Sequence, residues 1–186
     1  YEVDDAMVHD LHHPRMMHAC NLGGLIAREI AQRAGVKAYI ADPGVVDEMD
    51  ELVHMTGLPQ IRRISILHTL NQRAIARIYA REQGRKYEEM NLVIMHMGGG
   101  ISVAAHERGR IVDNNNALNG DGPFSPERSG TLPAIGLVDL CFSGEYTRDQ
   151  ILKLLAGKGG LTAHLGTNSV VEVVERIEKG DEHARL

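Results

Sequence analysis

The sequence predicts an α/β fold, and three observations support this. Segments with apolar residues at helical spacing alternate with short apolar segments of strand length. Residues 91–97, 101–109 and 110–115 alternate like strands and are joined by tight glycine-containing turns, which predicts an antiparallel meander. Glycine and proline residues separate the helical patterns that follow. Helices and a sheet are therefore both expected, as in the α/β class.

Composition narrows the functional class. The chain has 186 residues, of which 43% are hydrophobic and 24% charged, so it is neither disordered nor collagen-like. A net charge of −5 and 4% aromatic residues argue against nucleic-acid binding. Cys20 and Cys141 follow no metal or redox spacing, which predicts reduced thiols in a cytoplasmic protein. No stretch is long enough to span a membrane, and the missing initiator Met suggests a piece of a longer protein.

The first elements place a carboxylate at a strand end. Residues 16–34 have helical periodicity, and 36–41 read as a short buried strand. Asp42 is then held extended by Pro43 and opens a second helix that runs to Gly57. A carboxylate at such a place is often functional in α/β proteins. The local pattern by itself favours a simple helix cap.

Residues 65–84 predict another helix. Its exposed side carries arginines four residues apart: Arg73, Arg77, Arg81 and Arg85. The stripe could bind phosphate or nucleic acid, but a solvated or subunit-facing stripe suits an acidic chain better. His68 lies at the start of this helix beside apolar neighbours, where it would ordinarily be a core or surface histidine.

The turn between the first two predicted strands is rich in glycine. His96 and Gly98–Gly100 occupy it, and a turn without side chains lets backbone N–H groups approach a phosphate. The pattern matches neither of the common phosphate-loop motifs, so a plain hairpin turn is the simpler interpretation.

A long loop follows the meander, at 116–133, and long ordered loops are often functional. Within it Arg128 precedes Ser129 and Gly130, where a guanidinium could clamp an anion or merely bind loop carbonyls. Helices are expected beyond it, near 134–143, 147–156 and 168–180.

Together these segments resemble the acetokinase family, and in particular its butyrate and branched-chain fatty-acid kinases. The resemblance is carried by HMGGGISVAAHERGRIVDNNNALNGDGPFSPERSG (96–130), with FSPERSG (124–130) the most specific piece. YIADPGVVDEM (39–49), SILHTLNQRAIAR (65–77), GGLTAHLGTNS (159–169) and GDEHARL (180–186) add to it. One departure is that acetate kinases usually carry Asn where Gly99 stands.

The resemblance implies the fold of the acetate and sugar kinase, heat-shock and actin superfamily, whose two ribonuclease-H-like domains close over a cleft. Residues 1–42 would be the C-terminal part of the first domain. Residues 43–186 would be the N-terminal and middle part of the second, opening with the strand meander at 91–115. Family members are about twice this length, so both domains are expected to be incomplete and the chain alone inactive.

The resemblance also implies the chemistry. Such a kinase transfers a phosphoryl group in line and reversibly from ATP to butyrate or a branched C4–C5 acid, giving ADP and an acyl phosphate. Arg128, His68 and Asp42 would be catalytic, with Asp42 holding Mg²⁺ through water. His96, Gly98, Gly99 and Gly100 would bind the nucleotide phosphates, and His18 and Asn21 would border the substrate pocket.

Other interpretations stay open from the sequence. The chain could be a non-catalytic nucleotide-binding or interaction module, or belong to a kinase of the same superfamily that acts on a hydroxyl. The expected partners are a small carboxylate and a nucleotide, not nucleic acid or membrane. In the full-length protein we expect a homo-oligomer, a dimer or higher.

Overall fold

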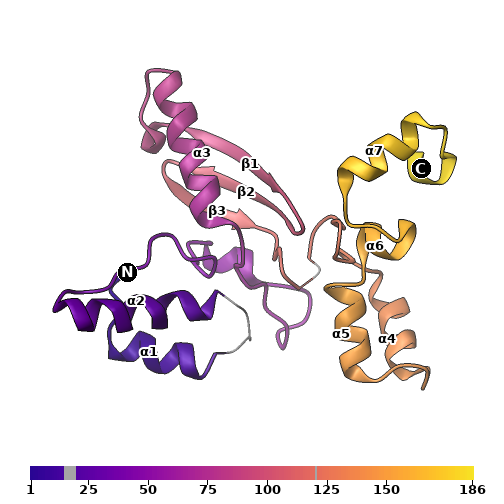
Figure 1. Cartoon of the computed structure of the whole chain (residues 1–186), viewed down its shortest axis with the longest axis horizontal. Coiled ribbons are helices and arrows are strands. Elements are labelled where there is room, and N and C mark those ends of the chain that lie inside the picture. The colour runs from indigo at the N-terminus through magenta and orange to yellow at the C-terminus, as the bar shows by residue number, and fades with distance from the viewer. Residues whose placement is uncertain (15–19, 120) are drawn as a thin grey trace. The chain divides into compact units, whose positions relative to one another are not determined.

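The computed structural model describes residues 1–14, 20–119 and 121–186. The chain divides into two compact units, residues 1–43 and 44–186, each described here by itself (Figure 1). In the described ranges no helix combines the length and the apolar character that crossing a bilayer requires. The assignment of the two units as parts of ribonuclease-H-like domains stays a prediction.

The first unit is a pair of helices, α1 (Asp5–His12) and α2 (Asn21–Ala34), packed on an extended segment. Its hydrophobic core consists of the buried residues Val3, Ala31 and Ala38. The helix predicted over 16–34 is confirmed for 21–34, and residues 15–19 lie outside the described ones. The predicted strand at 36–41 is wrong: this segment forms only an isolated bridge between Glu2 and Tyr39.

The predicted helix from Asp42 to Gly57 is also wrong. Asp42 has a φ of 44° instead of an extended conformation, and the only helical turn in this stretch is η1 (Glu51–His54). The segment is held by side chains distant in sequence. The Ser65 hydroxyl donates to the Val46 carbonyl (2.7 Å), and Glu48 pairs with Arg73 (2.6 Å). These tertiary contacts outweigh a weak local preference for helix.

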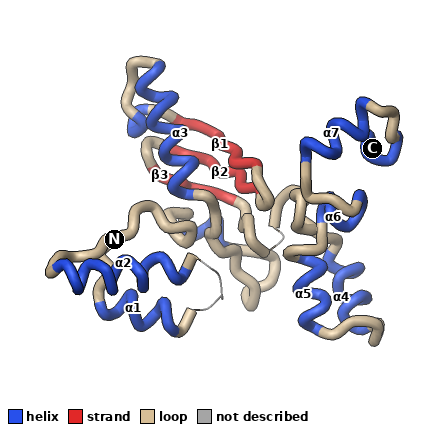
Figure 2. Tube along the Cα trace, viewed as in Figure 1, coloured by secondary structure: helices blue, strands red, loops and turns tan. Residues whose placement is uncertain are grey.

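The second unit contains a three-stranded antiparallel sheet of β1 (Asn91–Met97), β2 (Ile101–Glu107) and β3 (Arg110–Asn114), in that order. This confirms the predicted meander. Helix α3 (Thr69–Glu82) lies along one face of the sheet (Figure 2). Side chains alternate along a strand, so the pairs Leu92–His106, Ile94–Ala104 and His96–Ser102 share a face. The short helix η2 (Tyr87–Glu89) joins α3 to β1.

The arginine stripe of α3 is not a uniform exposed surface. Arg77, Arg81 and Arg85 are exposed as predicted, but Arg73 is only 9% exposed and pairs with Glu48. Arg77 lies over the Tyr87 ring, 5.8 Å from its centroid. Arg73 was misplaced because helical spacing alone does not show which side of a helix meets the core.

The C-terminal part is helical. The three predicted helices are confirmed as α4 (Ala134–Phe142), α5 (Arg148–Leu155) and α7 (Val170–Glu178). Two short helices, α6 (Gly160–Leu165) and α8 (Glu182–Arg185), were not predicted, nor was α1. The side-chain oxygens of Thr147 and Ser169 accept from backbone N–H groups in the first turns of α5 and α7, which explains where these helices begin.

Candidate active site

Two histidines from different elements stack on each other at one end of the sheet. His68 immediately precedes α3, and His96 is the sixth residue of β1. Their ring centroids are 3.6 Å apart and the ring planes differ by 7°. The Asn71 side-chain amide donates to His96 Nδ1 (2.9 Å), so the next helical turn holds the second ring. The start of α3 and the register of β1 therefore bring the two histidines together as a stacked pair.

The environment of His68 keeps its ring neutral. Burial, together with the neighbouring His96 and Arg128, lowers the pKa of His68 to about 4. Its Nδ1 lies 2.9 Å from the Ser102 hydroxyl. At neutral pH the ring is thus an uncharged imidazole that can both donate and accept a hydrogen bond.

The glycine turn lies beside the histidine pair. Gly98 N–H donates to the Gly100 carbonyl (3.0 Å), so this N–H closes the turn. Within the described residues, the N–H groups of Gly99 and Gly100 donate to no protein acceptor. A Cβ at Gly98 would lie 3.2 Å from His96 Nε2, and one at Gly99 would meet only the Glu127 carboxylate, at 3.6 Å. Gly99 and Gly100 thus fit a role as donors to a phosphate oxygen.

The loop that carries Arg128 is bonded directly to the glycine turn. The Ser125 hydroxyl donates to the Gly99 carbonyl (2.7 Å), and Ser125 N–H donates to the Arg128 carbonyl (3.0 Å). The Arg128 guanidinium donates to the Ala117 carbonyl and packs against Gly100. Burial lowers the pKa of Arg128, although an arginine stays charged at any ordinary pH.

For Arg128 the structure contains the contact with a loop carbonyl that the sequence offered as one of two interpretations. That contact occupies one guanidinium nitrogen, Nη1. A guanidinium has five N–H donors, so the contact fixes the side chain while leaving donors for an anion. The two interpretations of Arg128 are therefore compatible.

Helices α5 and α6 brace this loop from behind. Ser129 N–H donates to the Leu155 carbonyl (3.0 Å), and the Thr162 hydroxyl donates to the Pro126 carbonyl (3.0 Å). The Glu127 carboxylate accepts from the Asn168 amide. Residues 125–129 are thus fixed by both adjoining helices, which suits a positioned cationic clamp.

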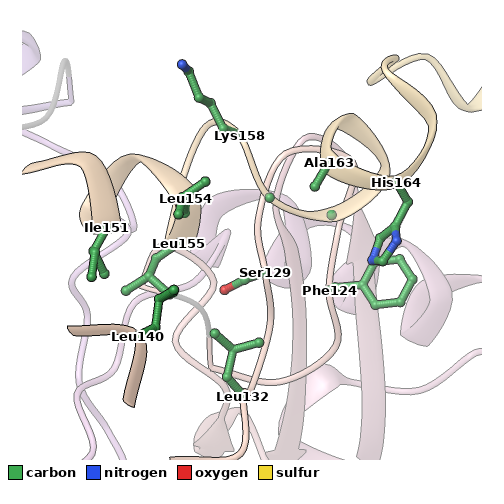
Figure 3. Close-up of a pocket in the computed structure, with 12 residues that line it drawn as sticks. Phe124, Ser129, Leu132, Leu140, Ile151, Leu154, Leu155, Lys158, Ala163 and His164 are labelled. Carbon is green, nitrogen blue, oxygen red and sulfur yellow. The ribbon is translucent and has the colours of Figure 1, made fainter. Parts of the chain in front are cut away.

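An apolar cavity of about 200 Å³ lies behind the same loop (Figure 3). Leu132, Leu140, Ile151 and Leu155 line it, and the rings of Phe124 and His164 face each other at its edge, 6.1 Å apart. Among its labelled residues only Ser129, Lys158 and His164 carry polar side chains, and Lys158 points away from it. The cavity offers no set of converging polar groups.

The remaining predicted residues belong to the other unit. Asp42 and Asn21 are both partly buried, and His18 lies outside the described residues. The structure thus brings together His68, His96, the glycine turn and Arg128 within one unit. Across the described residues no three His, Cys, Asp or Glu side chains form a cluster that could hold a metal ion.

Sequence reasoning missed several residues that hold this site: Asn71, Gln72, Ser102 and Ser125. A signal was available for two of them. The hairpin prediction places Ser102 opposite His96, and helical spacing places Gln72 one turn after His68. Ser125 depends on how the loop folds back on the turn, which no local pattern shows.

Comparison with known proteins agrees with this architecture. The chain superposes on a Porphyromonas gingivalis acetate kinase with a TM-score of 0.83 at 22% identity, covering 100% of this chain and 49% of that chain. A Francisella tularensis propionate kinase gives 0.81 at 18% identity, covering 100% and 50%. The fold is therefore the α/β fold of the acetate and propionate kinases, as predicted.

Comparison of sequences identifies the family as well as the fold. The model of the acetokinase family matches residues 55–186. A probable butyrate kinase of Phocaeicola vulgatus is 58% identical over 98% of this chain and 51% of its own length. Butyrate kinase 2 of Clostridium acetobutylicum is 52% identical over 100% of this chain and 52% of its own length. The chain belongs to the acetokinase family, and it spans about half the length of the curated relatives it matches.

Proposed function

We propose that a protein of the relatives' full length carrying this chain transfers the γ-phosphoryl group of ATP to a short-chain carboxylate, namely butyrate or a branched C4–C5 acid. The products are ADP and an acyl phosphate, and the reaction is reversible. The observation that carries the proposal is the cluster of His68, His96, the glycine turn and Arg128 in one unit. Identities of 52–58% to butyrate kinases support the choice of acceptor.

The chemistry requires no general base. A carboxylic acid is ionised at neutral pH, so a carboxylate oxygen attacks the γ-phosphorus while the bond from that phosphorus to the bridging oxygen of ADP breaks. The obstacle is the approach of two anions. Catalysis therefore needs positioned donors and positive charge where negative charge develops.

The residues of the site supply these groups. Arg128 provides a fixed positive charge with a planar set of donors, suited to a carboxylate or to the transferring phosphoryl group. His68 is neutral at pH 7 and donates one hydrogen bond to an equatorial phosphoryl oxygen. Gly99 and Gly100 contribute backbone N–H groups to the nucleotide phosphates, and His96 supports the His68 ring by stacking on it.

The Mg²⁺ proposal rests on Asp42. A carboxylate is the ligand type that Mg²⁺ prefers, and Mg²⁺ commonly takes one or two protein carboxylates with the rest from water and phosphates. Bound there, the ion would neutralise phosphate charge.

Formation of acyl hydroxamate tests the proposal in a protein of full family length. The assay contains ATP and Mg²⁺ with acetate, propionate, butyrate, isobutyrate or isovalerate. Product with the four- and five-carbon acids is the expected result. No product with any acid, from a protein that still binds ATP, would contradict it and favour a hydroxyl acceptor or a binding module.

Two further expectations belong to the whole protein. We propose that it is a homo-oligomer, which light scattering would measure. We also propose that residues 1–186 alone do not turn over substrate, because they span about half the length of their relatives.

A further inference from the structure

A chain of buried hydrogen bonds runs behind the active site and ends at His68. It begins at the hydroxyl of Tyr87, near the ion pair of Arg73 with Glu48 (2.6 Å). The Tyr87 oxygen lies 2.6 Å from His106 Nδ1. Tyr87 is 3% exposed and His106 2%, so solvent does not compete for these bonds.

The middle of the chain is the side-chain amide of Gln72, which is fully buried. One of its polar atoms lies 3.1 Å from the Ser102 carbonyl oxygen and 2.8 Å from the Ser102 hydroxyl. A carbonyl oxygen only accepts hydrogen bonds, so the atom facing it must be the amide nitrogen. The amide oxygen therefore faces His106 Nε2, at 2.9 Å.

The orientation of the Gln72 amide fixes the positions of the protons on His106 and Tyr87. His106 Nε2 must carry a proton to donate to the Gln72 oxygen. Burial lowers the pKa of His106 to about 4, so the ring is neutral and its Nδ1 accepts from the Tyr87 hydroxyl. A neutral ring with its proton on Nε2 has only a lone pair on Nδ1, so the Tyr87 hydroxyl is the donor in this bond.

Counting donors and acceptors in the same way fixes the positions of the protons on Ser102 and His68. The Ser102 hydroxyl oxygen accepts from the Gln72 nitrogen and, at 3.4 Å, from the His68 backbone N–H. Both of its lone pairs are then in use, so its own proton is available to His68 Nδ1 at 2.9 Å. An accepting Nδ1 on a neutral imidazole places the ring proton on Nε2.

We propose that Ser102 and Gln72 are positioning residues that hold His68 in the Nε2–H tautomer. Every hydrogen bond from Tyr87 to His68 points the same way, so the network leaves one donor, the Nε2–H of His68, at its end. The opposite tautomer would present an Nε2 lone pair. This inference rests on the proposed function in one respect: a lone pair there would repel the phosphoryl oxygens that an Nε2–H stabilises.

The test combines imidazole ¹⁵N NMR, which separates protonated from unprotonated ring nitrogens, with steady-state kinetics in a protein of full family length. In the unsubstituted protein we expect the His68 proton on Nε2. Ser102→Ala removes the donor to Nδ1, so we expect mixed tautomers and a fall in kcat of about tenfold, with a smaller change in KM for ATP.

Ser65→Ala is the matched control. Ser65 is 3% exposed, donates to the Val46 carbonyl (2.7 Å) and accepts from the Asn114 amide (2.9 Å), so it is another buried, twice-bonded hydroxyl in the same unit. A merely structural role for Ser102 predicts equal effects of the two variants. The proposal predicts a similar loss of stability but an unchanged tautomer and kcat in Ser65→Ala.

Gln72→Glu should reverse the direction of the hydrogen bonds between residue 72, Ser102 and His68, with almost no change in side-chain volume. A carboxylate accepts on both sides, so the Ser102 proton turns toward it and His68 takes its proton on Nδ1. We expect the NMR signature to switch and kcat to fall about 10²–10³-fold, as when one preorganised donor is lost. Ser102→Ala removes a single hydroxyl, so the test stands even if Gln72→Glu fails to fold.

Two results would overturn the proposal: a His68 proton on Nδ1 in the unsubstituted protein, or an unchanged His68 tautomer in Ser102→Ala. The NMR readout does not depend on turnover. An Nε2–H tautomer that is lost in Ser102→Ala, in a protein that phosphorylates no acid, would support the positioning role and contradict only the proposed function.

Discussion

The guanidinium of Arg128 occupies the space that a side chain at Gly100 would need. A Cβ at position 100 would overlap Arg128 and would lie 3.0 Å from the Ala117 carbonyl oxygen. The packing of Arg128 therefore requires a glycine at this position. This contact links the glycine turn to the segment FSPERSG (124–130).

Gly100→Ala should displace Arg128, because a flexible guanidinium yields more easily than the backbone carbonyl. We expect the rate of acyl phosphate formation to fall toward that of an Arg128 deletion, about 10²-fold or more. The hydroxamate assay measures it. Gly136→Ala in α4 is the control, since its Cβ meets nothing within 4 Å and alanine favours the helix. Full activity in Gly100→Ala would contradict this packing argument.

Arg128→Ala tests the cationic clamp directly. Loss of one preorganised charged donor typically lowers the rate by about 10²–10³-fold, and we expect at least that fall in a protein of full family length. Arg128→Lys should restore little, because an ammonium cannot reproduce a planar pair of donors. An unchanged rate in Arg128→Ala would remove this residue from the mechanism.

Glu48→Ala should destabilise the fold. Glu48 pairs with Arg73 (2.6 Å) and accepts from Ile111 N–H (2.9 Å), so its loss leaves a buried guanidinium without its counter-charge. Removing one partner of such a pair costs about 3 kcal/mol or more. Glu51→Ala is the matched control, because Glu51 pairs with Arg62 on the surface (2.8 Å) and should change stability by less than about 1 kcal/mol. Equal effects in urea unfolding would contradict the prediction.

Acid should weaken the fold through His106. Burial lowers its folded-state pKa to about 4, whereas an unfolded histidine titrates near 6.5. The unfolded chain therefore binds the proton first, and stability falls as the pH drops from about 6.5 toward 4. Arg73 acts in the same direction and Glu48 against it.

Between pH 7 and pH 5 this group should contribute about 2 kcal/mol of lost stability. His106→Gln cannot titrate, so its unfolding free energy should depend less on pH over that range. His68, whose pKa is also lowered to about 4, adds a dependence of the same sign in both proteins. Parallel pH profiles for the two proteins would show that His106 is not buried and neutral.

Patterns over a few neighbouring residues were enough to predict the elements that interactions between neighbouring residues stabilise. The glycine turn at 98–100 and the alternation on either side of it are enough to predict the β1–β2 hairpin, and with it the face that His96 shares with Ser102. Helices α3, α4, α5 and α7 follow from apolar spacing and from caps such as Thr147 and Ser169. The family resemblance supplied the proposed roles of His68, His96 and Arg128, because no local pattern distinguishes these residues from structural ones.

The predictions that failed share one cause: each of these residues forms a bond or ion pair with a residue that is distant in the sequence. The segment after Asp42 had helical spacing, yet Glu48 is bonded to Arg73 and Ile111, which lie 25 and 63 residues further on. Arg73 had the spacing of an exposed stripe, yet it is buried by the same pair. Such bonds outweigh intrinsic propensities of a few tenths of a kcal/mol per residue.

The sequence by itself therefore determined the hairpin, most of the helices and the family. Only the tertiary structure decided how His68 is stacked, which groups fix its tautomer, and why Gly100 must lack a side chain. Turns and helices depend on neighbouring residues. A buried network depends instead on satisfying every donor and acceptor at once, across elements that meet only in the folded chain.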